Sequence, residues 1–505
     1  MDAVQISLAV VLILLPVALL STLARKRRRG PPLPPGPLAL PIIGHLHLLG
    51  PHLHQTFHEL GRRHGTLFQL RLGSVFCVVA STPELAREFL KTHEIVFSNR
   101  KHSTAIDVVT YESSFAFSPY GPYWKYIKKL CTYELLGARN LSHFQPVRTM
   151  EVRAFLQILM GKAELGEIVN VTEELVKLAS NVISHMMLSI RCSGTEGDAE
   201  AARTVIRQVT QIFGEFDVAD LIWFFKNLDL QGIRKRSEDI QRRYDALLEK
   251  IISDREEERR SHGRGEEARD FLDMFLDVME GGKAEVNFTR EHLKALILDF
   301  FTAGTDTTAI ATEWAIAELI NNPDVLKKAQ NEIDQVVGLD RLVEESDWPN
   351  LPYLQAVVKE MFRLHPPIPM ISRKSVSDSV VGGHSIPANS LLFVNIWSMG
   401  RNPNYWEDPM QFRPERFIGS SIDIKGQHFE LLPFGTGRRG CPGMLLAIQE
   451  LIVIIGTMVQ CFDWRLPEGC GKVDMTERLG LTAPRANDLV CRVVPRVSPE
   501  TLSEH

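Results

Sequence analysis

Apolar and polar positions follow three patterns along the first two thirds of the chain. Residues 6–24 form an apolar run without a formal charge. Residues 67–72 and 76–79 alternate between apolar and polar side chains, which predicts two short strands joined by a turn at Gly73 and Ser74. From about residue 83 to residue 322 the apolar positions recur at helical spacing, so this long part is predicted to be mostly helical.

The pattern changes after residue 363. Proline-rich loops carry short strand-like segments at 379–381 and 391–394, and a last helix is predicted at about 441–460. Strands and helices do not alternate regularly, which excludes a doubly wound parallel sheet. The fold class is therefore predicted to be mainly α with small β-sheets.

The apolar run at 6–24 predicts a membrane anchor. As a helix it would be about 28 Å long, enough to cross a bilayer core. Five basic residues, 25–29, follow the run, whereas a cleaved signal peptide carries its charge before the apolar stretch. Basic flanks stay on the cytosolic side. The expected organisation is an anchor at 1–29, a stiff proline-rich hinge at 30–37 and one cytosolic catalytic domain at 38–505.

Charge and cysteine content exclude several classes of protein. The net charge is −5 even with the five basic residues at 25–29, so the remaining chain is acidic and unsuited to nucleic acid. Seven scattered cysteines without a C-x-x-C pair indicate neither a disulfide framework nor a zinc ribbon. A reducing compartment is expected.

One cysteine has a distinctive neighbourhood. Cys441 precedes a predicted helix, whose unpaired N–H groups favour a thiolate. Gly437 and Gly443 leave room for a flat, bulky group, Arg439 can pair with an anion, and Phe434 can shield the sulfur from water. A thiolate is one of the few axial ligands of haem iron. The alternative is a structural cysteine in a glycine-rich loop.

A second group of polar residues lies inside a long helical pattern at 290–321, for which Thr289 is a plausible N-cap. Residues 302–308 include four threonines and one glycine, a poor helix-forming composition that predicts local opening of the helix. The acid–alcohol pair Asp306 and Thr307 is suited to relaying protons. The alternative is a core helix with a buried threonine cluster.

In this order, the motifs resemble those of the cytochrome P450 superfamily over almost the whole chain. The resemblance implies the cytochrome P450 fold, haem b with Cys441 as axial ligand of the iron, and proton delivery by Asp306 and Thr307 during dioxygen activation. No G-x-G-x-x-G phosphate loop stands out, so electrons from NADPH are expected through a separate NADPH–cytochrome P450 reductase, with Lys128 and Lys129 as docking candidates. The anchor and hinge are similar to those of microsomal members, which implies the endoplasmic reticulum membrane.

Other roles follow from the same resemblance. Trp124 and Lys128 resemble a W-x-x-x-R element that faces one haem propionate, with lysine in place of the two-pronged arginine. Arg373 is expected to face the other propionate. A structural triad is expected to lock the loop that presents the cysteine: Glu360, Arg363 and Arg416.

The segments 299–309, 311–314 and 427–437 closely resemble plant flavonoid enzymes that act on flavanones of the naringenin, eriodictyol or liquiritigenin type. The prediction is a flavone synthase II, which introduces the C2–C3 double bond. A flavanone 2-hydroxylase and a 2-hydroxyisoflavanone synthase stay open as alternatives. The isoflavone synthase pattern has a lysine where this chain has Ser372 and a serine where it has Thr307. Both differences disfavour aryl migration.

A mostly apolar pocket with a few hydroxyls suits a neutral polyphenol. The walls are expected from the substrate regions of the family, with ordinary core packing as the alternative for each residue. They are Ile106, Tyr111, Phe115, Leu298, Phe301, Ala303, Met370, Ile371, Leu481 and Thr482.

Three rival classes are weighed against this prediction. A haem carrier needs Cys441 but not the acid–alcohol pair, and a dioxygen-independent haem-thiolate isomerase tends to lose that pair. A membrane-tethered scaffold would bind no haem and show no carbon monoxide band. Asp306 and Thr307 therefore favour the monooxygenase.

Overall fold

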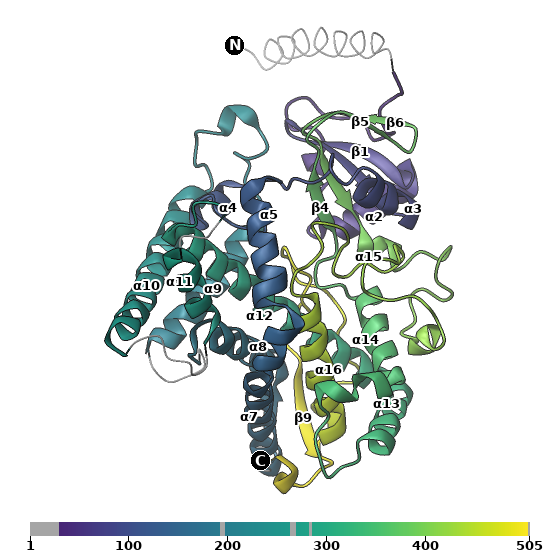
Figure 1. Ribbon diagram of the computed structural model, residues 1–505. Coiled ribbons are helices and arrows are strands. Elements are labelled where there is room, and N and C mark those ends of the chain that lie inside the picture. Colours follow the sequence, from purple (N-terminus) through teal and green to yellow (C-terminus); the bar gives the residue numbers. More distant parts are fainter. Residues whose placement is uncertain (1–29, 192–196, 263–268, 282–284, 503–505) are drawn as a thin grey trace, which may run out of the picture.

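The computed structural model describes residues 30–191, 197–262, 269–281 and 285–502. The predicted anchor at 1–29 lies outside these residues. The described chain is mainly helical with three small sheets, as the sequence predicts (Figure 1).

The largest sheet contains four strands in the order β1-β2-β7-β4, and β2 and β7 run parallel. A second sheet has the order β3-β9-β8, and β5 pairs with β6 alone. The strands are β1 (Leu67–Leu72), β2 (Val75–Ala80), β3 (Ile168–Asn170), β4 (Ile371–Lys374), β5 (Ser379–Val381), β6 (His384–Ile386), β7 (Leu391–Val394), β8 (Phe462–Arg465) and β9 (Val490–Pro495).

Helices supply most of the remaining fold. The α-helices are α2 (Leu53–His64), α3 (Pro83–Arg87), α4 (Thr104–Val109), α5 (Pro122–Lys129), α6 (Ala138–His143), α7 (Gln145–Glu164), α8 (Val171–Leu188), α9 (Gly197–Gly214), α10 (Ile233–His262), α11 (Phe271–Glu280), α12 (Arg290–Asn321), α13 (Pro323–Val336), α14 (Pro352–Leu364), α15 (Ile396–Met399) and α16 (Met444–Cys461). Short 3₁₀ turns are η1 (Leu46–Leu48), η4 (Trp223–Phe225), η5 (Glu345–Asn350), η6 (Pro414–Phe417) and η7 (Pro499–Leu502), and π-helical turns are η2 (Glu88–Thr92) and η3 (Leu130–Leu135).

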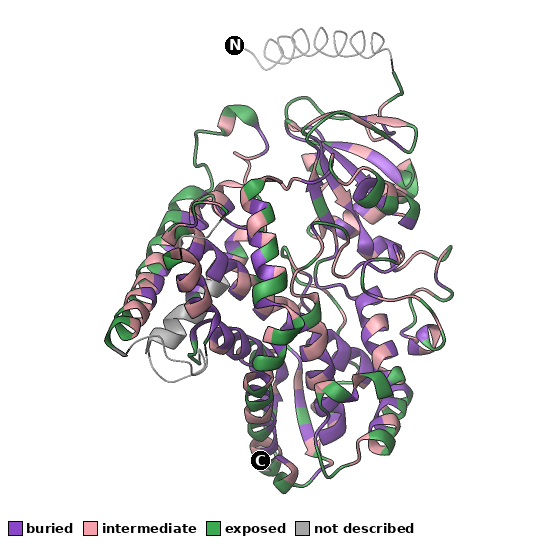
Figure 2. Ribbon diagram, in the orientation of Figure 1, coloured by how far each residue is buried: buried purple, intermediate pink, exposed green. Residues whose placement is uncertain are grey.

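The central helix is α12, which packs against α8, α16 and α14. Its start is fixed as predicted, because the Thr289 hydroxyl and the His292 ring form a capping box. Figure 2 shows that buried residues concentrate in the four-stranded sheet and in the central helices, whereas α10 and α13 turn exposed faces outward.

Two predicted features differ in the structure. The last helix begins at Met444 rather than near Cys441, so the cysteine lies in the loop before the helix. The region predicted as mostly helical also contains β3, a strand of three residues that pairs with β9 more than 300 residues later. Such a short segment carries no period of its own, and its partner is distant in sequence.

Among the described residues, α16 is the single helix with the length and apolar composition to cross a membrane. About two thirds of it is buried inside the protein. It packs against α12, α13 and α14, so its apolar character is that of a core helix.

Candidate functional site

The loop before α16 presents Cys441. The backbone N–H of Cys441 donates to the Phe434 carbonyl at 2.9 Å, and Gly440 N–H donates to Gly437 O at 3.0 Å, which closes the loop on itself. Gly437 has φ +68°, and a Cβ there would lie 2.3 Å from Glu94 Oε1. The left-handed backbone conformation favours glycine at this position, and any side chain would also have to displace the Glu94 carboxylate.

The Cys441 side chain is accessible although protein surrounds it. Burial raises the pKa of its thiol, while the Gly443 N–H and the charges of Lys128 and Arg100 act in the opposite direction. A Cβ on Gly443 would lie 3.9 Å from Cys441 Sγ, an ordinary contact. The packing of the protein thus does not require glycine at position 443. Because Gly443 has no side chain, space is left beside the sulfur.

Four basic side chains lie in or near the cysteine loop, and two of them, Lys128 and Arg100, act electrostatically on the sulfur. Lys128 Nζ donates to Gly440 O at 2.8 Å, in the cysteine loop itself. Arg439 donates from Nε to Ser98 O at 2.8 Å, and its guanidinium lies 4.4 Å from the centroid of the Trp124 ring. The buried Arg373 reaches the Arg439 carbonyl at 3.5 Å. The fourth cation is Arg100, which acts electrostatically on the other three.

These cations are poorly compensated by the protein. Burial and mutual repulsion with Arg100 lower the pKa of Arg439 to about 9, and burial followed by repulsion from Arg100 and Arg439 lowers the pKa of Arg373. Within the described chain, Arg439 Nη1 and Arg100 Nε are buried and have no hydrogen-bond partner. The carboxylates that act on the cluster are Asp299, on Arg100, and Glu94, on Arg373.

Two carboxylates act on the four cations, and Glu94 is also paired with Arg438 at 3.0 Å, so positive charge is in excess in this desolvated site. Buried cations are stable only when they are paired. An accessible thiol beside buried cations with unpartnered N–H groups fits a group that carries a thiol-binding metal and carboxylates, and haem has both features.

The sequence reasoning missed Arg100 and Asp299. Asp299 accepts hydrogen bonds from Ser114 Oγ at 2.7 Å and Ala116 N–H at 3.3 Å, so it ties α12 to the loop after α4. Burial raises its pKa to about 6, and Ser114, Ala116 and Arg100 oppose the shift. Arg100 lies in no recognisable motif, and the resemblance of the segment 299–309 assigns no role to Asp299, so only the fold shows that their charges act on each other.

The helix α12 is α-helical at every residue, so the predicted local opening at 302–308 is not present. The hydroxyl of Thr307 donates to Ala303 O at 2.6 Å, and that of Thr302 donates to Leu298 O at 2.8 Å. The threonine hydroxyls thus bind carbonyls of the preceding turn without ending the helix. Ala303 is exposed in the middle of this helix, on the turn that also carries Thr307.

A carboxyl group reaches α12 from α16. Glu450 Oε2 accepts from the Thr308 hydroxyl at 3.2 Å, and burial raises the pKa of Glu450 to about 7. Asp306 itself is partly buried on the face beside Thr307.

The predicted triad is assembled and buried. Arg363 makes two hydrogen bonds of 2.7 Å to the two oxygens of Glu360, and Arg416 Nε donates to Glu360 Oε1 at 3.0 Å. Arg363 also donates to the carbonyls of Pro409 at 2.7 Å and Gln411 at 3.0 Å. The three side chains therefore hold α14 and the loop at 400–416 together.

The predicted pocket walls come from separate elements. Ile106, Phe115, Leu298 and Phe301 are buried, and Phe115 stacks on Trp124 with centroids 5.9 Å apart. Ile371 belongs to the apolar cluster beneath the four-stranded sheet, whereas Met370 packs with the cluster on the other face.

Three other predicted wall residues have a polar partner or lie on a loop tip. The Tyr111 hydroxyl donates to Asp245 Oδ1 on α10 at 2.7 Å. Leu481 and Thr482 lie at the tip of a loop, where Leu481 is exposed.

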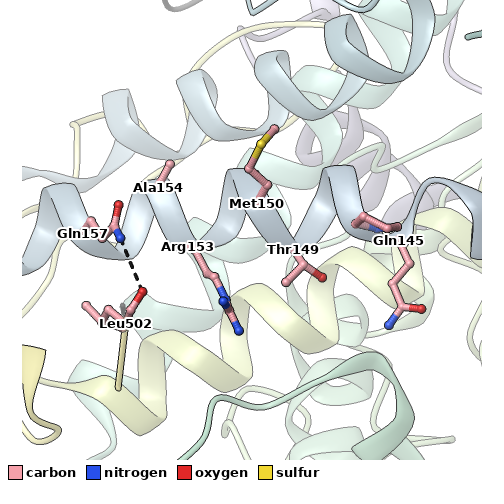
Figure 3. Close-up of a pocket in the computed structure, with 8 residues that line it drawn as sticks. Gln145, Thr149, Met150, Arg153, Ala154, Gln157 and Leu502 are labelled. Carbon is pink, nitrogen blue, oxygen red and sulfur yellow. Dashed lines mark hydrogen bonds between the residues drawn. The ribbon is translucent and has the colours of Figure 1, made fainter. Parts of the chain in front are cut away.

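A separate surface pocket of about 520 Å³ lies along α7 (Figure 3). It is lined by residues such as Thr149, Arg153 and Gln157, whose amide donates to Leu502 O at 3.4 Å. It contains none of the predicted site residues.

Comparisons with known proteins agree with this geometry. The family model described as cytochrome P450 matches residues 34–492. The chain is 62% identical over 468 residues to cytochrome P450 93B2 from Gerbera hybrida, and the match covers 91% of each chain. It is 44% identical over 521 residues to a 2-hydroxyisoflavanone synthase from Glycyrrhiza echinata, with 98% of each chain covered.

The fold is also similar to a solved structure. A zebra fish cytochrome P450 with progesterone matches with a TM-score of 0.77 and 27% sequence identity. The match covers 88% of this chain and 100% of the other.

Proposed function

Because the chain belongs to the cytochrome P450 family, in its plant flavonoid branch, it is a monooxygenase that uses haem, and we propose that it desaturates flavanones to flavones. The observation that carries the haem assignment is the accessible Cys441 thiol near four basic side chains, two of which have buried N–H groups without a partner. We assign Cys441 to the iron, and the cations to the two propionates.

Each cation has a distinct part in this proposal. Arg373 and Arg439 are held rigidly by backbone carbonyls, and Arg439 keeps one unpartnered N–H group for a ligand. Lys128 has one contact to the cysteine loop, so it fixes that loop and adds charge. Trp124 supports Arg439 through its ring face.

When bound, the haem supplies dioxygen activation with electrons from a reductase. The chain's part is to deliver protons and exclude water. Thr307 Oγ1 carries a proton that now points to Ala303 O, and a small rotation turns it toward the space beside Ala303. Asp306, next along the helix, is proposed to resupply that proton.

The substrate assignment rests on the pocket wall and on flavanone chemistry. C2 of a flavanone is benzylic and adjacent to the ring oxygen, so it loses hydrogen readily. The buried apolar side chains of Ile106, Phe115, Leu298 and Phe301 suit a flat neutral molecule. Removal of hydrogen from C2 and then C3 gives a flavone.

Two observations count against aryl migration. Identity is 62% to cytochrome P450 93B2 and 44% to the 2-hydroxyisoflavanone synthase. Ser372, where the isoflavone synthase pattern has lysine, is exposed in β4 on the face opposite the buried Arg373. The alternatives remain a flavanone 2-hydroxylase and a 2-hydroxyisoflavanone synthase.

We propose one catalytic domain at 38–505 after a hinge at 30–37 and an anchor at 1–29, and the family match over 34–492 supports the catalytic domain. Large apolar side chains are exposed in two nearby stretches: Leu38, Leu40 and Ile42, and Trp223, Phe224, Leu228 and Leu230. Both stretches contact the β1–β2 turn, through Gly73 N–H to Ile43 O at 3.2 Å and Ser74 N–H to Leu221 O at 2.7 Å. We propose that this edge faces the endoplasmic reticulum membrane.

The reductase is proposed to dock on the face that carries α5. Lys128 is unsuited to this role because its ammonium group turns inward to Gly440 O. Lys129 is exposed but pairs with Glu285 at 3.0 Å, which leaves it as a docking candidate together with the exposed Lys125.

A product assay tests the proposed function. The chain is expressed in microsomes with a reductase, supplied with NADPH and naringenin, and the product mass is measured before acid treatment. We expect a product that lacks two hydrogens. A product that gains one oxygen would overturn desaturation in favour of 2-hydroxylation, or of isoflavone formation if acid then yields an isoflavone.

A further inference from the structure

The loop at 476–486 forms a hairpin closed by backbone contacts. Glu477 and Arg485 form an isolated bridge, and Arg478 N–H donates to Pro484 O at 2.8 Å. The tip at 479–482 approaches the end of α9, because a Cβ built on Gly214 would lie 3.0 Å from the backbone nitrogen of Leu481. The predicted wall residues Leu481 and Thr482 thus lie on an exposed tip between two fixed arms.

The first arm is fixed at Glu477. This carboxylate accepts from Gln55 Nε2 at 2.9 Å and from Trp397 Nε1 at 2.9 Å, and it pairs with His54 Nε2 at 2.6 Å. Its side chain is only 6% exposed. Three donors from α2 and α15 therefore hold the arm.

The second arm is fixed from α12. The buried indole of Trp314 donates from Nε1 to Ala483 O at 2.9 Å. Its ring stacks on His365 with centroids 4.0 Å apart and planes at 8°, which leaves the indole one orientation. Ala483 N–H in turn donates to Pro367 O at 2.8 Å, so one residue links the hairpin to α12 and to the segment before β4.

We propose that Trp314 is a positioning residue for the substrate: its N–H bond to Ala483 holds the 481–482 tip at a fixed distance from the turn of α12 that carries Thr307. Trp314 and Thr307 lie on the same rigid helix, so the wall and the proton donor move together. This inference rests on the proposed function, and it concerns the choice between the two outcomes available to a flavanone.

The outcomes differ by one step. In desaturation, the flavanone loses hydrogens from C2 and C3, and with O2, NADPH and a proton it gives the flavone, two waters and NADP⁺. In hydroxylation, the same reactants give the 2-hydroxyflavanone, one water and NADP⁺, because the oxygen bonds to C2 before C3 loses its hydrogen. A fixed wall keeps the C3 hydrogen in reach and favours desaturation.

The test compares Trp314→Phe with Trp464→Phe. Trp464, on β8, is a matched control because its buried indole also donates to a backbone carbonyl, that of Met458 on α16, at 3.2 Å. Losing one such hydrogen bond changes an equilibrium by about fivefold. We expect W314F to raise the ratio of 2-hydroxylated to desaturated product by about fivefold, with a smaller spin-state change on flavanone binding. Equal product ratios in W314F and W464F would overturn the proposal.

Hydrogen exchange tests the same bond without substrate. In W314F the amides of the peptide 476–486 should exchange about fivefold faster than in the wild type, whereas W464F should leave them unchanged. Unchanged exchange in W314F would also overturn the proposal. If the wild-type enzyme makes no flavone while exchange still rises, the proposed function fails and the positioning bond stands.

A second variant tests the proposal independently if W314F folds poorly. Glu477→Gln loosens the other arm without altering α12, since glutamine keeps the shape of the carboxylate but loses the charge that pairs with His54. We expect E477Q to shift the product ratio in the same direction. If E477Q gives the wild-type ratio with faster exchange at 476–486, the hairpin does not set the outcome and the proposal is wrong.

Discussion

Single residues in this site acquire their chemistry from groups that lie far away in the sequence. Arg100 and Asp299 are separated by almost 200 positions, yet their charges act on each other beside Cys441. Cys441 and the pair at Asp306 and Thr307 could be predicted from local spacing. Arg100 could not, because an isolated arginine in a loop has no pattern that distinguishes it from a surface charge.

Replacing Thr307 with alanine removes one hydroxyl and tests proton delivery. We expect product per NADPH consumed to fall by about 10²-fold, the lower range for loss of an acid–base group, with continued NADPH oxidation and hydrogen peroxide release. The control is Thr302→Ala on the same helix, whose hydroxyl makes the same kind of bond to Leu298 O. Equal coupling in both variants would contradict a special role for Thr307.

The buried Asp299 predicts a dependence of stability on pH. Its pKa is about 6 in the folded protein, against an ordinary value of 3.8. Between about pH 6 and pH 4 this carboxyl group is protonated in the folded state but ionised in the unfolded chain. The free energy of unfolding therefore rises as the pH falls from about 6 to 4. Above pH 6 the burial of the charge costs about 2–3 kcal/mol.

Asp299→Asn checks this sign, because asparagine does not titrate. We expect the thermal midpoint of the variant to rise relative to that of the wild type as the pH increases from 5 to 7.5. The exposed Asp340→Asn serves as control. A difference between D299N and wild type that is the same at both pH values would show that Asp299 is not protonated in this range.

At the scale of elements, periodicity predicted α12 with its N-cap Thr289 and the strands β1, β5 and β7. It did not predict where α16 begins, because the two residues between Cys441 and Met444 have no apolar period of their own. The predicted opening of α12 was also wrong. Threonine composition lowers helix propensity, but burial against α8, α16 and α14 outweighs propensity.

The triad of Glu360, Arg363 and Arg416 joins α14 to the loop at 400–416. Arg363→Ala leaves the fully buried Glu360 with its main partner removed, which costs about 3–5 kcal/mol. We expect this variant to yield almost no haem-loaded protein. Arg413→Ala, which removes an exposed surface pair with Glu407, should leave haem loading close to that of the wild type. Normal haem loading in R363A would show that the triad does not hold the cysteine loop.

At the scale of the whole molecule, one edge differs from the rest of the surface. The turn at 73–74 joins the exposed apolar stretches 38–42 and 223–230, which both lie at the end of the molecule where the described chain begins (Figure 1). Contiguous exposed apolar surface of this kind is typical of an interaction with another apolar phase. Aromatic side chains such as Trp223 favour the membrane–water interface.

Fluorescence in vesicles with brominated lipids tests this orientation on the full chain. We expect Trp223→Phe to abolish most of the quenching of tryptophan emission, since Trp223 is 75% exposed at the proposed membrane edge. Trp348→Phe, on η5, should leave the quenching unchanged. The same quenching in W223F and wild type would place this edge in water.

The central claim is that Cys441 and the surrounding cations form the haem site, and the reduced carbon monoxide difference spectrum tests it most directly. Wild type should show the long-wavelength band of a thiolate-bound haem, and Cys441→Ser should lose it. Cys461→Ser, a buried thiol within α16, should keep the wild-type band. A thiolate band that persists in C441S, or disappears equally in C461S, would contradict the account.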